Sequence, residues 1–144
     1  MVSISKLEAA KVQLDRAIQL FFENDHVCAV SLAGAAEDIL GSLLQHRGQQ
    51  SPFEFLHDWY QTEYSANVTK RDFSREIANL PRNWLKHTNE HAASELDVSI
   101  VDSIMMLMRA VPCYYKLTGS HSKEMDRFNN HVDSNIEQIN EIMS

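Results

Sequence analysis

Glycine and proline are scarce in this chain, which has four glycines and three prolines among its 144 residues. Tight turns depend on these two residue types, so their shortage excludes the many-turned sandwiches and barrels of all-β folds. No stretch alternates apolar and polar residues as a half-buried strand would. The length is that of one ordinary domain. The sequence therefore predicts a single all-α domain over residues 1–144.

Cysteine is also scarce, because only Cys28 and Cys113 occur and neither belongs to a CxxC pair. Both lie in apolar helical runs, so we expect two buried free thiols, as is typical of a reducing compartment. Charges interrupt the first 22 residues, unlike a signal peptide. We find no run that approaches the roughly 18 apolar residues of a membrane span. The sequence predicts a cytoplasmic protein with no membrane partner.

Apolar residues recur at helical spacing through most of the chain, and serines stand where several of the helices would begin. The pattern predicts an up-and-down bundle of five to six helices. The segments with helical spacing, not all of which need be separate helices of the bundle, are 3–24, 27–46, a short one from Ser51, 70–80 and 82–90 on either side of Pro81, 100–117 and 122–143.

Two of these segments have features of their own. Segment 27–46 is apolar around most of its circumference, which predicts a central helix. Its Gly34 would cost about 1 kcal/mol in mid-helix, so we expect a neighbouring helix to come close there. In segment 70–80 we expect Phe73, Ile77 and Leu80 to face inward. The narrow apolar stripe of segment 122–143 is compatible with contact to a second subunit.

The charge is acidic overall, at −7, which argues against non-specific binding to nucleic acid. Residues 70–86, however, hold five basic residues against two acidic ones. An anionic ligand is therefore expected in this part of the chain. The candidate phosphate-binding or nucleic-acid-binding residues, besides Arg82, are Lys70, Arg71, Arg75 and Lys86.

The stretch Arg82-Asn83-Trp84-Leu85-Lys86-His87 combines groups that suit one reaction. An arginine binds phosphate through its planar guanidinium, and a histidine transfers protons near neutral pH. Asn83 can orient either group by hydrogen bonding. These are the parts of metal-independent RNA cleavage, in which the ribose 2′-hydroxyl attacks the adjacent phosphodiester. Arg82, Asn83 and His87 are thus candidate catalytic residues, although the spacing by itself also fits a purely structural role.

The same six residues resemble the R-x4-H signature of HEPN domains (higher-eukaryote and prokaryote nucleotide-binding), in which a polar residue such as Asn commonly follows the Arg. The helical pattern of residues 3–118 is similar as well. The segment SLAGAAEDIL at 31–40 resembles one found in small bacterial HEPN-like proteins.

The resemblance implies a homodimer in which the two motifs meet in one cleft. It also implies ribonuclease activity, in a toxin or defence context, with RNA or a nucleotide as ligand and an antitoxin-type protein as a further partner. Arg82 would stabilise the phosphate, His87 would act as general acid or base, and Asn83 would orient one of them. Other HEPN domains are non-catalytic binding modules, which is the alternative.

A metal site is a second interpretation of the residues that follow Arg82. His87-Thr88-Asn89-Glu90-His91 has the H-x-x-E-H order of inverzincin proteases, and two histidines four apart can chelate zinc. Such a site needs a further carboxylate, and nothing after His91 singles one out. We therefore predict no metal and no cofactor.

The remaining charged and histidine residues have less specific expectations. Glu37 and Asp38 interrupt the central helix, so they could pair with Arg82 or Lys86, either as a structural ion pair or as neighbours that set the pKa of His87. We expect the other histidines to be solvated or to cap helices. They are His26, His46, His57, His121 and His131.

Overall fold

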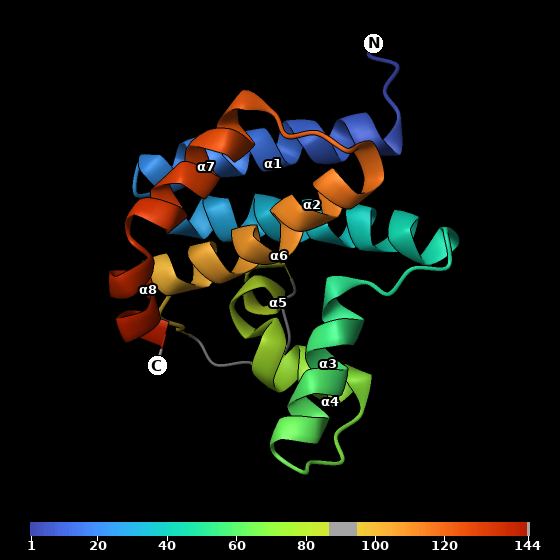
Figure 1. The fold of residues 1–144 in the computed structure, drawn as a ribbon, viewed down its shortest axis with the longest axis vertical. Helices are drawn as coiled ribbons and strands as arrows, with labels where there is room; N and C mark the ends of the chain where they lie inside the picture. Colours follow the sequence, from blue (N-terminus) through green and yellow to red (C-terminus); the bar gives the residue numbers. More distant parts are fainter. Residues whose placement is uncertain (87–94, 144) are drawn as a thin grey trace.

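The computed structural model describes residues 1–86 and 95–143, and these residues are helical with no strand among them, which confirms the all-α prediction (Figure 1). The elements are α1 (Lys6–Phe22), α2 (His26–His46), α3 (Pro52–Glu63), α4 (Lys70–Phe73), the π-helical turn η1 (Ser74–Ala78), α5 (Leu80–Lys86), α6 (Ile100–Thr118), α7 (Lys123–Ser134) and α8 (Ile136–Met143).

Three helices begin at a serine whose hydroxyl accepts a backbone N–H of the first turn, while an acidic side chain three residues on accepts the N–H of that serine. The pairs are Ser5–Glu8, Ser51–Glu54 and Ser99–Asp102. A cap of this kind stabilises a helix by about 1 kcal/mol. These three starts confirm the prediction that serines stand where several of the helices begin.

Helix α2 is the central element, as its apolar circumference predicts. It packs against α1 on one side and α6 on another, and α5 lies against it as well. Figure 1 shows α7 across α1, while α3, α4 and α5 extend below the long helices as a separate lobe. In this excursion between α2 and α6 the chain brings α5, which carries Arg82, against one edge of α2.

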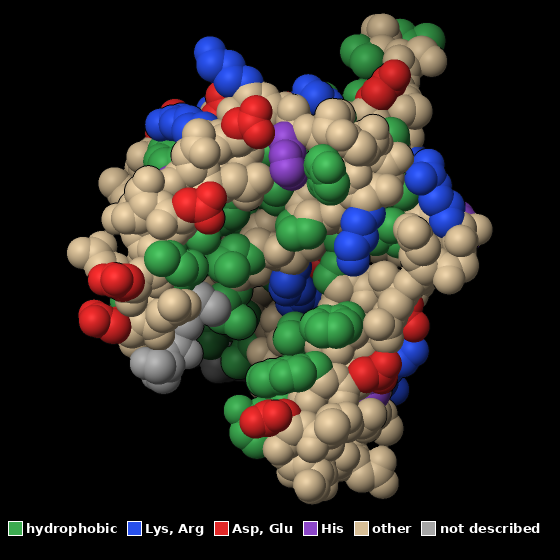
Figure 2. All heavy atoms as spheres, viewed as in Figure 1, with side chains coloured by type: hydrophobic (Ala, Val, Ile, Leu, Met, Phe, Trp, Pro, Cys, Tyr) green, Lys and Arg blue, Asp and Glu red, His purple; other side chains and the backbone are tan. Residues whose placement is uncertain are grey.

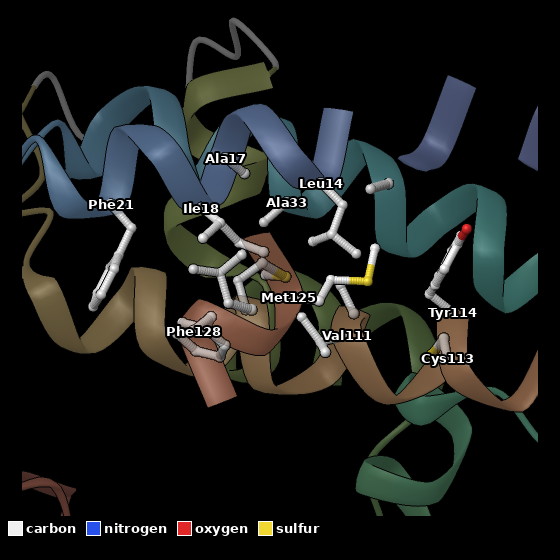
Figure 3. Packing of buried hydrophobic residues seen from close by; sticks show 14 of the residues in the cluster. Leu14, Ala17, Ile18, Phe21, Ala33, Val111, Cys113, Tyr114, Met125 and Phe128 are labelled. Atoms are coloured by element: carbon white, nitrogen blue, oxygen red, sulfur yellow. The ribbon is translucent and has the colours of Figure 1, made fainter. Parts of the chain in front are cut away.

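The main core lies where α1, α2, α6 and α7 meet. In Figure 3, Leu14 and Ile18 of α1 point toward Met125 and Phe128 of α7, and Val111 of α6 belongs to the same cluster. All five are at most 1% exposed. Burial of each such side chain contributes about 1.5–3 kcal/mol, which explains why these four helices pack together.

Helix α2 also meets, by length and composition, the requirement for a membrane span, with a mean hydropathy of 1.6 over its best 18 residues. The expectation that no run approaches this threshold is therefore wrong for His26–His46. Half of that window is buried inside the protein, so core burial accounts for the same apolar composition.

The segment 70–80 differs from its prediction. It is divided into α4 and η1, and Asn79 N–H donates to Ser74 O at 3.0 Å, a hydrogen bond to the fifth residue back. This widened turn shifts the inward face, so Phe73 is 1% exposed whereas Ile77 and Leu80 are 43% and 42% exposed. Single π turns of this kind occur frequently at functional sites.

Two further expectations are corrected. The last predicted helix is broken at Asn135 into α7 and α8, and with the division of 70–80 this raises the number of helices in the described residues to eight α-helices and a π turn. Cys113 is buried as predicted, but Cys28 is exposed. Cys28 lies in the first turn of α2, where the helix emerges from the core.

Candidate functional site

The site is built around Arg82, which α5 directs onto the surface of α2. Only 8% of the side chain is exposed, and its guanidinium forms an ion pair with Asp38 of α2. Lys86, one turn further along α5, places its Nζ 3.8 Å from the same Asp38 oxygen. Asp38 thus pairs with both Arg82 and Lys86, the two partners that the sequence suggested for it.

Gly34 makes room for this arginine. It lies one turn before Asp38, and a Cβ at this position would be 2.8 Å from Arg82 Nε and 2.9 Å from Arg82 Cδ. The expected close approach at Gly34 is therefore confirmed, but it is made by one side chain of α5. Gly34 and Asp38 together fix the path of Arg82 across α2.

A second ion pair lies beside the first, and both of its side chains are largely buried. Glu37, 3% exposed, accepts a hydrogen bond at 2.8 Å from Arg109 of α6. Arg109 also donates to Ala78 O at 3.1 Å and to Asn79 Oδ1 at 2.9 Å. Burial raises the pKa of Glu37 above its usual value, although the charges of Arg109 and Arg82 oppose the shift. This network ties α2, α6 and the end of η1 together.

Asn83 anchors α5 to the π turn. Its Nδ2 lies 3.3 Å from both the carbonyl and the hydroxyl oxygen of Ser74, and Asn79 Nδ2 donates to the same hydroxyl at 2.8 Å. These hydrogen bonds go to Ser74 and not to Arg82. Asn83 therefore connects α5 to η1. Its predicted role in orienting Arg82 or His87 stays a prediction, because His87 lies outside the described residues.

Two pockets lie on either side of Arg82. The first has a volume of about 250 Å³, and the second has a volume of about 220 Å³. Arg82 and Asp38 line both of them. The first is also lined by Glu37, Gly41, Ser42, Gln45, Ser51, Phe53, Ser74, Asn79 and Asn83, and the second by Ser31, Ala35, Leu85 and Lys86. Arg82 thus separates the two pockets. The second is the more basic, because Lys86 lines it, whereas Glu37 lines the first.

The other basic candidates are paired elsewhere. Lys70 Nζ lies 3.4 Å from Glu54, and Arg75 lies 3.0 Å from Asp72 and 3.3 Å from Glu76. All of these pairs are on the surface, where ion pairs contribute little to stability. Arg71 is exposed on α4. Of the predicted phosphate-binding residues, only Lys86 lies near the carboxylate of Asp38, which also pairs with Arg82.

His87 and the H-x-x-E-H stretch 87–91 lie outside the described residues. Within residues 1–86 and 95–143, no group of three or more His, Cys, Asp or Glu side chains is arranged to hold a metal ion.

Among the other histidines, His57 contradicts its expectation. It is 6% exposed, its Nε2 lies 2.6 Å from Val68 O, and its ring packs 5.3 Å from that of Phe73. It therefore belongs to the small core of the α3–α4 lobe. His46 is exposed, as expected.

Sequence reasoning missed Arg109 and Asn79. The signal for Arg109 was present, since it is the single charged residue in the middle of a strongly apolar helix, and such a charge requires a buried partner. Asn79 carried no comparable signal, because its burial follows from the widened π turn.

No model of a known protein family, no curated protein and no solved structure matches this chain.

Proposed function

We propose that this chain is a metal-independent endoribonuclease of the HEPN type, which acts as a dimer. The observation that supports the proposal best is the placement of Arg82, which is fixed by Asp38 and Gly34 between two pockets and precedes His87 by five residues. A guanidinium has five N–H donors, so pairing with Asp38 leaves donors for a phosphate.

The reaction assigns one role to each residue. A base removes the proton of the ribose 2′-hydroxyl, the 2′-oxygen bonds to phosphorus, and the bond from phosphorus to the 5′-oxygen breaks. The leaving 5′-oxygen takes a proton, so the products end in a 2′,3′-cyclic phosphate and a 5′-hydroxyl. In this proposal His87 moves one of these protons, and Arg82 stabilises the charge that develops on the phosphate oxygens.

The test compares wild type, His87→Ala and, as a matched control, His46→Ala, an exposed histidine at the C-terminal end of α2. Each protein is incubated with mixed RNA, with and without a chelator, and the product ends are identified. We expect chelator-resistant cleavage, a loss of about 100-fold or more in His87→Ala, and no loss in His46→Ala. A folded His87→Ala protein with full activity would contradict the proposal.

A second candidate function is RNA or nucleotide binding without cleavage. It is favoured by the burial of Arg82 to 8% exposed, because an arginine that is nearly buried and paired with Asp38 also serves as a structural tie between α5 and α2. Binding of labelled RNA by both wild type and His87→Ala, without products from either, would support it. Arg82→Lys keeps the charge and loses the planar fork, so it should weaken binding about tenfold in this case.

A further inference from the structure

The outer face of α6 carries a row of apolar side chains. Met105, Met108 and Tyr115 are 43%, 38% and 50% exposed, Pro112 is exposed, and Val101 is half-buried. These five residues, which we name the α6 seam, are separated by four, three, four and three positions. That alternation is the heptad spacing by which one helix packs along another.

The seam is separate from the core. The opposite face of α6 buries residues such as Leu107 and Ala110 against the other long helices, so core packing does not require the seam to be apolar. Figure 2 shows hydrophobic side chains spaced along α6 on the face toward the viewer. A continuous exposed apolar row of this kind marks an interaction surface.

The charges at the two ends of α6 indicate which partner fits. Glu95, Asp97 and Asp102 lie at its start, whereas Lys116 lies at its end and Arg47 donates to Leu117 O there at 3.2 Å. A second α6 laid antiparallel on the seam would bring each acidic end beside a basic end, and the helix dipoles would also be opposed. A parallel second copy would place like charges together.

We propose that a second copy of this chain packs on the α6 seam, with the two α6 helices antiparallel about a two-fold axis between Met108 and Arg109. In this arrangement Met105 of each copy faces Pro112 of the other, and the same patch serves both subunits. The inference deepens the proposed function, because it names the surface that forms the dimer.

The interface would also reach the candidate site. Arg109 follows Met108 at the centre of the seam, and its guanidinium bonds to Glu37 and Asn79, which line the larger pocket. Packing of a second copy beside Arg109 would therefore restrict the residues that hold this pocket in shape.

The experiment is sedimentation of the full chain from micromolar to millimolar concentration. We expect a dimer whose dissociation constant rises about 30-fold or more in Met108→Glu, since two carboxylates would meet near the axis. Tyr115→Glu gives a second probe should Met108→Glu lose its helical circular dichroism. Val12→Glu is the matched control, because Val12 is an apolar residue 60% exposed on α1, and it should leave the dimer unchanged.

A charge exchange tests the orientation. Asp97→Lys and Lys116→Asp should each weaken the dimer, and the double variant should recover most of the loss. A wild type that stays monomeric, a Met108→Glu protein as dimeric as wild type, or a double variant weaker than both single ones would overturn the inference. Sedimentation does not depend on RNA cleavage, so a catalytically inactive dimer would argue against the proposed function alone.

Discussion

At the scale of single residues, Gly34 is explained by the arginine that crosses it, and this leads to a double-mutant prediction. Alanine in place of Gly34 would favour the helix by about 1 kcal/mol. Its Cβ, however, would lie 2.8 Å from the Nε of the buried Arg82 side chain. We expect a net loss of about 1–3 kcal/mol in the free energy of unfolding, because Arg82 must leave its position beside Asp38.

In an Arg82→Ala background the same Gly34→Ala change should instead stabilise the protein, by about 1 kcal/mol. Urea unfolding of the four proteins gives both values. If Gly34→Ala had the same effect with and without the arginine, the contact with Arg82 would not be the reason for glycine at this position.

Glu37 provides a residue-scale prediction about pH. Its pKa is raised in the folded protein, first by burial, so folding favours its protonated form. The stabilisation from this group is complete below the unfolded pKa, about 4.3, and is lost as the pH rises through the higher folded pKa.

The difference in the free energy of unfolding between wild type and Glu37→Gln should therefore fall as the pH is raised from about 4 to 7. Urea titrations at several pH values measure it. A difference that rises with pH would mean that the attraction of Arg109 and Arg82 outweighs burial at this carboxylate.

At the scale of elements, the start of α3 depends on Glu54. Hydrogen bonds from Gln45 at 2.6 Å and from Ser51 N–H at 3.3 Å, with Lys70 nearby, lower the pKa of Glu54 to about 2. A lowered folded pKa gives stability that is present above the unfolded pKa and is lost as the pH falls toward about 2.

Glu54→Gln should thus destabilise the protein by about 1 kcal/mol at pH 7 and have little effect near pH 2. Glutamine can still complete the capping box, so the change removes the charge and keeps the cap. Glu63→Gln, at the exposed C-terminal end of α3, is the matched control for loss of one negative charge from the same helix. Thermal unfolding followed by circular dichroism across this pH range would show either result.

At the scale of the whole molecule, the proposed dimer makes stability depend on concentration. Association through the α6 seam stabilises only the folded chain, so the Tm of wild type should rise with protein concentration, whereas that of Met108→Glu should stay constant. Scanning calorimetry over a hundredfold concentration range, roughly, suffices to separate the two. Equal slopes for both proteins would argue against a folded dimer.

The fold class and much of the helix layout could be predicted from the sequence because they follow from local patterns. Few glycines and prolines, apolar residues at helical spacing and serine caps act within a few residues of chain. The central place of α2 followed in the same way, from an apolar surface on most of its circumference. The Arg82–His87 motif could be singled out because its chemistry depends on residue type and spacing, and its catalytic role stays a prediction.

The details of the site were decided by tertiary contacts between residues far apart in the chain. The π turn at η1 exposes Ile77 and Leu80 and buries Asn79, which no periodic pattern encodes. Arg82 pairs with Asp38, and Arg109 pairs with Glu37. An unpaired buried charge is costly, so each arginine pairs with the carboxylate that the packing of the helices brings within reach. Sequence spacing determined which groups were available, and the way that α5 and α6 pack on α2 decided which of them meet.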